Sequence, residues 1–190
     1  MKYYIARIGN NILISATYRT VIPNYIKRPK EKTEYMNLVV RSLESAINYW
    51  NSRVDTYEEN GETYNIHYNL SYRTMLTNCD DSIPYSVLDD ALFSKKTVSG
   101  NIENKDRIQI KKSRALLKPG EKPYRLTGVH EIGHSLGMED EKVGVMSALN
   151  TEDARSDYIS NENLERMLSH HKGEEVNWLK RLIIKIERRW

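Results

Sequence analysis

Two histidines with the spacing of a metal-binding helix stand four residues apart, at His130 and His134. Residues four apart lie on one face of a helix, so both imidazoles can reach the same ion. Glu131 directly follows the first histidine and can sit beside the open coordination position, where a carboxylate can take up a proton. These three residues predict a zinc-binding helix that also carries a general base.

A third protein ligand is needed, because two nitrogen ligands do not hold Zn²⁺ firmly. Gly137, three residues after His134, is suited to end the helix in a left-handed turn that returns the chain beneath the metal. Asp140 then lies six residues after His134, and a carboxylate oxygen binds zinc at about 2.0–2.2 Å. We therefore expect His130, His134 and Asp140 to bind the metal.

The segment 130–140 has the pattern HExxHxxGxxD, which resembles the metzincin zinc endopeptidases. Those proteases usually carry a histidine at the last position, and the aspartate is similar to that of the snapalysins, small secreted bacterial proteases. Met146, within residues 144–147, resembles the methionine turn that lies below the metal in metzincins. The resemblance is close over residues 123–147, and elsewhere only the order of elements agrees.

The resemblance implies a zinc-dependent endopeptidase that hydrolyses peptide bonds of protein substrates. The three expected ligands would hold one catalytic Zn²⁺, which activates a water molecule for attack on the peptide carbonyl. Glu131 would take the proton of this water and pass it to the leaving amine. Gly137 and Met146 would support the site structurally.

Two alternatives stay open. In a gluzincin-type zinc peptidase the third ligand is a glutamate on a later helix, and Glu162 or Glu165 has that position here. The second alternative, from a different functional class, is a non-catalytic zinc-holding module that binds a partner through a C-terminal helix. Only the enzyme requires Glu131. Peptide deformylases share HExxH but take a cysteine ligand from upstream, and Cys79 lacks the setting of that family.

The elements around this site follow from periodicity and turn residues. A helix is expected over about 33–52, with Thr33 as its N-cap, because apolar residues recur there at helical spacing. Pro123 is expected to begin the metal-binding helix and Gly137 to end it. We expect strands at 2–8, 11–18, 54–57, 64–72, 91–98 and 107–111, an irregular segment at 74–90, and helices at 161–171, capped by Ser160 or Asn161, and at 175–189.

This order predicts an α+β fold. The resemblance implies that the fold is a single metzincin-like catalytic domain. Its parts would be a small twisted mixed sheet, a backing helix, the active-site helix and a C-terminal helix. The domain is expected over residues 1–172, with an appended basic amphipathic helix over 173–190. Substrate would pair with an exposed strand edge, expected at Ala91, Leu92, Phe93 and Ser94.

Composition narrows the function classes. The chain has 190 residues, 39% of them hydrophobic, and contains no apolar run long enough to span a bilayer. Its net charge of +3 is too small to indicate nucleic-acid binding. Residues 180–190 hold five basic side chains and one acidic one, so the remainder is nearly neutral. We expect the basic charge to belong to the C-terminal helix.

The partners expected are a polypeptide substrate and, through residues 175–190, either a membrane surface or an acidic protein. The alternative for this helix is packing on the domain with solvated charges. We favour a monomer. A structural Ca²⁺ at Asp80 and Asp81 is a further option without support beyond the two carboxylates. The charged N-terminus, with Lys2 and Arg7, predicts an intracellular protein, one exported without a cleaved signal, or a mature form.

Overall fold

The computed structural model describes residues 3–74, 82–93, 100–103, 107–147 and 156–169, with backbone only for 100–103. Three α-helices and seven strands lie in these segments, with three short 3-10 turns between them. The helices are α1 (Pro29–Asn51), α2 (Thr127–Ser135) and α3 (Asn161–Ser169). The strands are β1 (Tyr3–Ile8), β2 (Asn11–Thr20), β3 (Val54–Glu59), β4 (Glu62–Arg73), β5 (Ile83–Leu88), β6 (Gly100–Glu103) and β7 (Arg107–Lys111). The α+β class expected from the sequence is confirmed.

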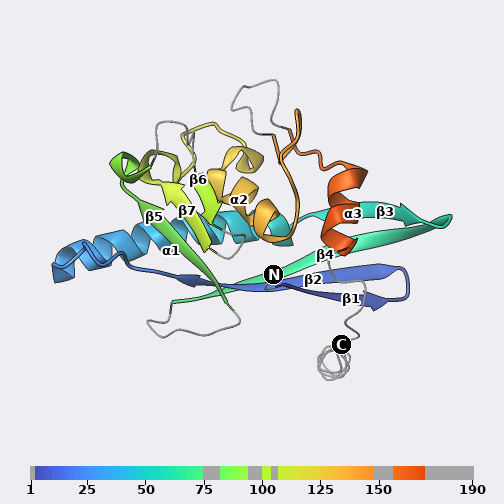
Figure 1. The fold of residues 1–190 in the computed structure, drawn as a ribbon, viewed down its shortest axis with the longest axis horizontal. Helices are drawn as coiled ribbons and strands as arrows, with labels where there is room; N and C mark the ends of the chain where they lie inside the picture. Colours follow the sequence, from blue (N-terminus) through green and yellow to red (C-terminus); the bar gives the residue numbers. More distant parts are fainter. Residues whose placement is uncertain (1–2, 75–81, 94–99, 104–106, 148–155, 170–190) are drawn as a thin grey trace.

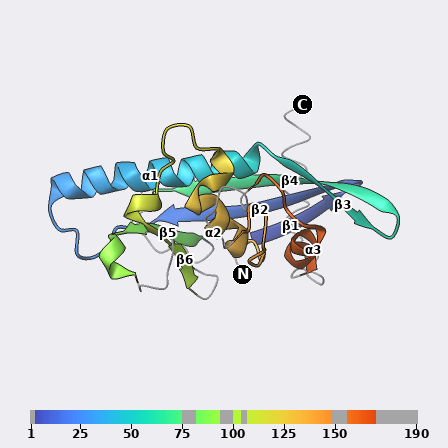
Figure 2. The same ribbon diagram turned by 90° about the horizontal axis from the view of Figure 1, so that it is seen from above.

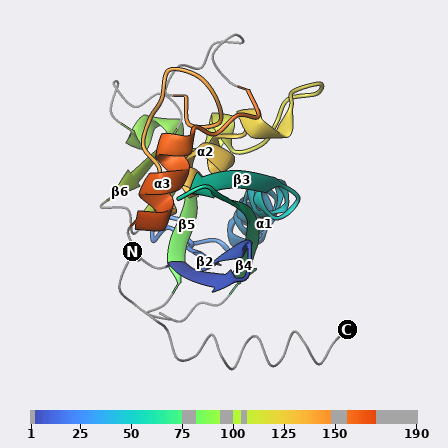
Figure 3. The same ribbon diagram turned by 90° about the vertical axis from the view of Figure 1, so that its right-hand side faces the viewer.

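All seven strands form one mixed sheet in the order β3-β4-β2-β5-β7-β6, with β1 beside β2. The four inner strands β4, β2, β5 and β7 run parallel to one another. The outer strands β1, β3 and β6 each pair antiparallel. The sheet curls, as the end-on view in Figure 3 shows.

Helices α1 and α2 cover the same face of this sheet (Figures 1 and 2). Trp50 of α1 lies against Tyr68 of β4, with ring centroids 5.0 Å apart. The Ser135 hydroxyl of α2 lies 2.9 Å from the Tyr18 hydroxyl of β2. Every second residue of β2 is buried, and this buried set includes Ile14 and Tyr18. Ile14 pairs with Tyr68 of β4. Tyr18 and Tyr68 therefore point to the same face of the sheet, the one that the two helices cover. The core therefore lies between this face and the two helices.

The strands expected at 2–8, 11–18, 54–57 and 64–72 and the long helix are present, but the start of the helix was predicted wrongly. Helix α1 begins at Pro29, four residues before Thr33, and Arg28 is its N-cap residue. The Thr33 hydroxyl instead donates to the Pro29 carbonyl inside the first turn. Proline suits the first helical position because its fixed φ matches the helix and its missing N–H would have no partner there.

The prediction that residues 74–90 are irregular was wrong over β5. This strand lies between β2 and β7 and is buried over five of its six residues. The strand was not predicted because it contains Pro84, and proline cannot donate a hydrogen bond to a sheet. The structure accommodates this proline because pairing with β7 begins only at Tyr85. Strand β5 thus occupies the centre of the sheet without an alternating sequence pattern.

Two further expectations need correction. Ala91 and Leu92 belong to a 3-10 turn, Asp90–Leu92, and not to a strand, because the Leu92 N–H closes back onto the Asp89 carbonyl. Pro123 begins a 3-10 turn, and α2 starts only at Thr127, because Leu126 adopts an extended backbone and turns its side chain into the core. The strand at 107–111 is confirmed as β7.

Helix α3 confirms the expected helix after residue 160, with Ser160 as its cap. The Asn163 N–H donates to the Ser160 hydroxyl over 3.1 Å. The helix expected at 175–189, the domain boundary at 172–173, the acidic pair Asp80 and Asp81, and Cys79 all lie outside the described residues. Among the helices that the structure describes, none has the length and apolar character needed to cross a bilayer.

Candidate metal centre

Helix α2 brings the two histidines of the motif to one point. Their Nε2 atoms lie 3.1 Å apart, and both side chains are mostly buried. Asp140 Oδ1 lies 3.2 Å from His130 Nε2 and 3.3 Å from His134 Nε2. The structure therefore groups the three ligands expected from the sequence, and no other such group of histidine, cysteine, aspartate or glutamate occurs in the part of the chain that it describes.

Backbone carbonyls fix the orientation of both imidazole rings. His130 Nδ1 lies 3.2 Å from the Val145 oxygen, and His134 Nδ1 lies 3.0 Å from the Met138 oxygen. A carbonyl can only accept, so each neutral ring carries its hydrogen on Nδ1 and presents a lone pair at Nε2. Two lone pairs and a carboxylate oxygen thus face one another, an arrangement that attracts a cation.

The three separations match the edges of a tetrahedron around a zinc ion. Ligands at about 2.0–2.1 Å from a tetrahedral zinc lie about 3.3–3.4 Å from one another. The observed distances are 3.1, 3.2 and 3.3 Å. Two imidazoles and one carboxylate also form a donor set of the kind found in catalytic zinc sites, which leave one position open. The residues present therefore fit a metal ion without rearrangement.

The titration behaviour of the group also reflects its attraction for a cation. Hydrogen bonding from His130 and then from His134 holds the pKa of Asp140 well below its usual range. Burial lowers the pKa of His134, but hydrogen bonds to Asp140 and to the Met138 carbonyl, with the charges of Glu131 and Asp140, raise it overall. Protons and metal ions therefore compete for this group as the pH falls.

Gly137 makes the turn that returns the chain to the site. Its φ is +92°, in the left-handed region that favours glycine. The Gly137 N–H donates to the His134 carbonyl and the Met138 N–H to the Gly133 carbonyl, closing the helix end. The same turn directs the Met138 carbonyl to the ring of His134. The left-handed turn expected at Gly137 is confirmed.

Glu131 is buried on α2, with 4% of its surface exposed. Its position directly after His130 places it beside the metal-binding group, and its charge acts on the His134 ring. It is not a member of the three-residue group itself. A buried carboxylate that acts on the His134 ring without joining the three-residue group could carry a proton near that group.

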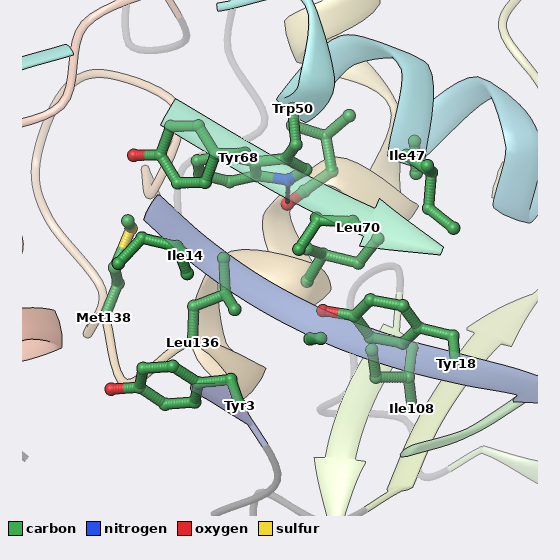
Figure 4. Packing of buried hydrophobic residues seen from close by; sticks show 14 of the residues in the cluster. Tyr3, Ile14, Tyr18, Ile47, Trp50, Tyr68, Leu70, Ile108, Leu136 and Met138 are labelled. Carbon is green, nitrogen blue, oxygen red and sulfur yellow. Dashed lines mark hydrogen bonds between the residues drawn. The ribbon is translucent and has the colours of Figure 1, made fainter. Parts of the chain in front are cut away.

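Met146 lies beneath the helix that carries the histidines. It is fully buried, and its sulfur lies so close to Gly133 that it would overlap an added Cβ. Trp50 closes the same space and donates from its indole Nε1 to the Val129 carbonyl over 3.1 Å. Nearby, Leu136 and Met138 pack with Ile14 (Figure 4). The turn at Met146 thus packs against the buried side of the metal-binding helix.

Substituting Gly133 with alanine is expected to lower the free energy of unfolding by about 1–3 kcal/mol, because the added methyl overlaps the buried sulfur of Met146. Helix propensity alone would favour alanine, so a lower free energy of unfolding would come from the packing conflict with Met146. Urea unfolding of the metal-free protein measures it. In a Met146→Ala background the cost should shrink, and equal costs in both backgrounds would contradict the direct contact.

Other residues considered from the sequence lie apart from this group. Leu92 is 59% exposed in its 3-10 turn, and Phe93 lies beneath the Lys111 ammonium, so the expected substrate edge is not formed by these residues. Ser94 lies outside the described residues. Glu162 pairs with Arg166 on α3, and neither it nor Glu165 joins the two histidines.

Sequence reasoning missed the groups that orient the ligands. The Val145 and Met138 carbonyls, which fix the rings, leave no side-chain signal in the sequence. Asn163, 2% exposed, pairs with both backbone groups of Glu139, the neighbour of Asp140. A buried asparagine in the first turn of an amphipathic helix was the available signal, since buried amides need partners.

No protein-family model matches the chain, and a comparison with curated proteins also gives no match. A function for this chain therefore has to be inferred from the geometry of the site and from the resemblance that its motif carries.

Proposed function

We propose that this protein is a zinc-dependent endopeptidase. The observation that carries the proposal is the convergence of two Nε2 lone pairs and the Asp140 carboxylate within 3.3 Å, beside a buried glutamate. A structural zinc site needs no such glutamate. The motif resemblance to metzincins agrees with this arrangement and supplies the reaction class.

In this proposal His130, His134 and Asp140 would hold Zn²⁺, which would lower the pKa of a bound water molecule and polarise the substrate carbonyl. Glu131 removes a proton from the attacking water, holds it on its carboxylate and passes it to the leaving nitrogen. Its burial favours this role, because a proton held away from bulk water is not lost to solvent between the two transfers.

Strand β6 is the edge along which we would place the substrate backbone. It is the last strand of the sheet, pairs antiparallel with β7, and contacts α2. An extended peptide can add to such an edge by main-chain hydrogen bonds. This placement replaces the edge expected at Ala91–Ser94 and keeps the same mode of recognition.

The proposal is tested by metal analysis and cleavage of casein or a peptide library by the purified protein. We expect one zinc per chain and cleavage that a chelator abolishes and added zinc restores. Zinc bound without any cleavage would instead support the non-catalytic zinc-holding module. Absence of bound metal at saturating zinc would contradict both functions.

The gluzincin alternative makes a distinct prediction about the third ligand. Asp140→Ala is expected to lose zinc, since its oxygen completes the observed group, whereas Glu165→Ala and Glu162→Ala should keep one zinc per chain. Metal content after dialysis at fixed free zinc measures all three. Loss of zinc in Glu165→Ala or Glu162→Ala, with retention in Asp140→Ala, would favour the gluzincin arrangement.

A further inference from the structure

One buried amide on α3, that of Asn163, forms hydrogen bonds with the backbone of Glu139, the residue before Asp140. The Glu139 N–H donates to Asn163 Oδ1 over 2.8 Å, and Asn163 Nδ2 donates to the Glu139 carbonyl over 2.9 Å. Asn163 is only 2% exposed, so its two hydrogen bonds form away from bulk solvent. The amide therefore fixes the backbone of Glu139 on both sides of its Cα.

The residue after Asp140 is held by two other contacts. The Glu141 N–H donates to the Met146 carbonyl over 2.8 Å, which joins it to the turn beneath the metal-binding helix. The Glu141 carboxylate accepts from the hydroxyl of Ser160, the residue that caps α3. Both neighbours of Asp140 thus contact α3. Glu141 is bound by Ser160, the cap of the helix, and Glu139 by Asn163 in its first turn.

Arg166 adds a charged contact one turn further along α3. Its guanidinium forms ion pairs with the Glu139 carboxylate and with Glu162, the latter over 2.7 Å. We call Ser160, Asn163 and Arg166 the α3 clamp. These three side chains all contact the loop that carries Asp140, and none of them belongs to the metal-binding group.

The Asp140 side chain itself is 56% exposed, unlike the two histidines. An exposed carboxylate on a free loop would sample many positions, and ordering it on metal binding would cost conformational entropy. Holding the backbone on both sides removes much of that cost before the metal arrives. The need for such a device is specific to Asp140, because the histidines are already ordered by α2 and by their Nδ1 hydrogen bonds.

We propose that the α3 clamp positions Asp140 for metal binding and that Asn163 is its principal positioning residue. This inference rests on the proposed metal site and deepens it: the third ligand depends on a helix that follows it in the sequence by more than twenty residues. Groups that orient metal ligands typically contribute 10–100-fold to metal affinity when they are removed.

The test is Zn²⁺ affinity of the full chain, measured by competition with a chromophoric chelator well below the unfolding temperature. Asn163→Leu keeps a similar volume and loses both hydrogen bonds, so affinity should fall by about 10–100-fold. The visible absorption of bound Co²⁺ should change as well, since Asp140 would no longer complete the tetrahedral set. Val39→Ala is the matched control for a loss of stability. It leaves a cavity where the buried Val39 side chain of α1 packs, so it should lower the free energy of unfolding and leave zinc affinity unchanged.

Arg166→Ala provides a second arm should Asn163→Leu fold poorly, because Arg166 lies at the surface. It should lower zinc affinity in the same direction, and its control Glu162→Ala, which leaves the Glu139 ion pair intact, should not. Wild-type affinity and Co²⁺ spectra in both clamp variants, with Asp140→Ala still losing zinc, would overturn the clamp alone. Wild-type affinity in Asp140→Ala would overturn the metal site on which it rests.

Discussion

Glu131→Gln should lower the rate of peptide hydrolysis by about 10²–10⁴-fold while leaving zinc content unchanged. Glutamine has the same size and still fits the buried position on α2, but it cannot accept a proton from the attacking water. Since Glu131 is not part of the three-residue ligand group, its substitution should not release the metal. The measurement is cleavage of a fluorogenic peptide at saturating substrate, with zinc content determined on the same sample.

Glu165→Gln is the matched control, a charge-neutral change of the same chemical kind on α3, and should cleave like wild type. Cleavage by Glu131→Gln at the wild-type rate would contradict a general base at this position. Loss of zinc together with activity would make Glu131 a metal ligand and not a proton carrier. The two readouts thus separate proton transfer from metal binding.

The metal-binding group was predictable because its determinants are local. The spacing of His130 and His134 sets their common helix face, and Gly137 must take a positive φ to end that helix. Asp140 lies only six positions after His134, so the turn brings the loop that carries it back to the metal-binding helix. These short-range constraints bring the three ligands to one region, where they lie 3.1–3.3 Å apart.

The parts that sequence reasoning missed depend on distant pairing. Strand β5 contains a proline and lacks an alternation of apolar and polar residues. It forms a strand because β2 and β7 flank it in the sheet. The hydrogen bond from Trp50 to the Val129 carbonyl joins residues 79 apart, and Asn163 lies 24 residues from Glu139. Such contacts arise from the packing of α1, α2 and α3, which local periodicity does not encode.

Zinc is expected to raise the unfolding temperature of the wild-type protein by roughly 5–10 °C when free zinc is about 100 times its dissociation constant. Binding to the folded state alone contributes about 2.7 kcal/mol at that ratio. For a chain of 190 residues each kcal/mol shifts the midpoint by about 2–4 °C. Scans at pH 8 measure the shift. At acidic pH it should vanish, because the raised pKa of His134 favours the proton.

Asp140→Ala should show no zinc-induced shift under the same conditions, because two histidines alone hold zinc weakly. Its zinc-free midpoint should fall less than that of a variant that removes a buried side chain, since the Asp140 side chain is half exposed. His130→Ala should also lose the shift but start from a lower midpoint, because it removes a buried ring hydrogen-bonded to Val145. A shift in Asp140→Ala equal to that of wild type would place the zinc elsewhere in the chain. The pair of variants therefore separates the contribution of the metal to stability from that of the side chains that hold it.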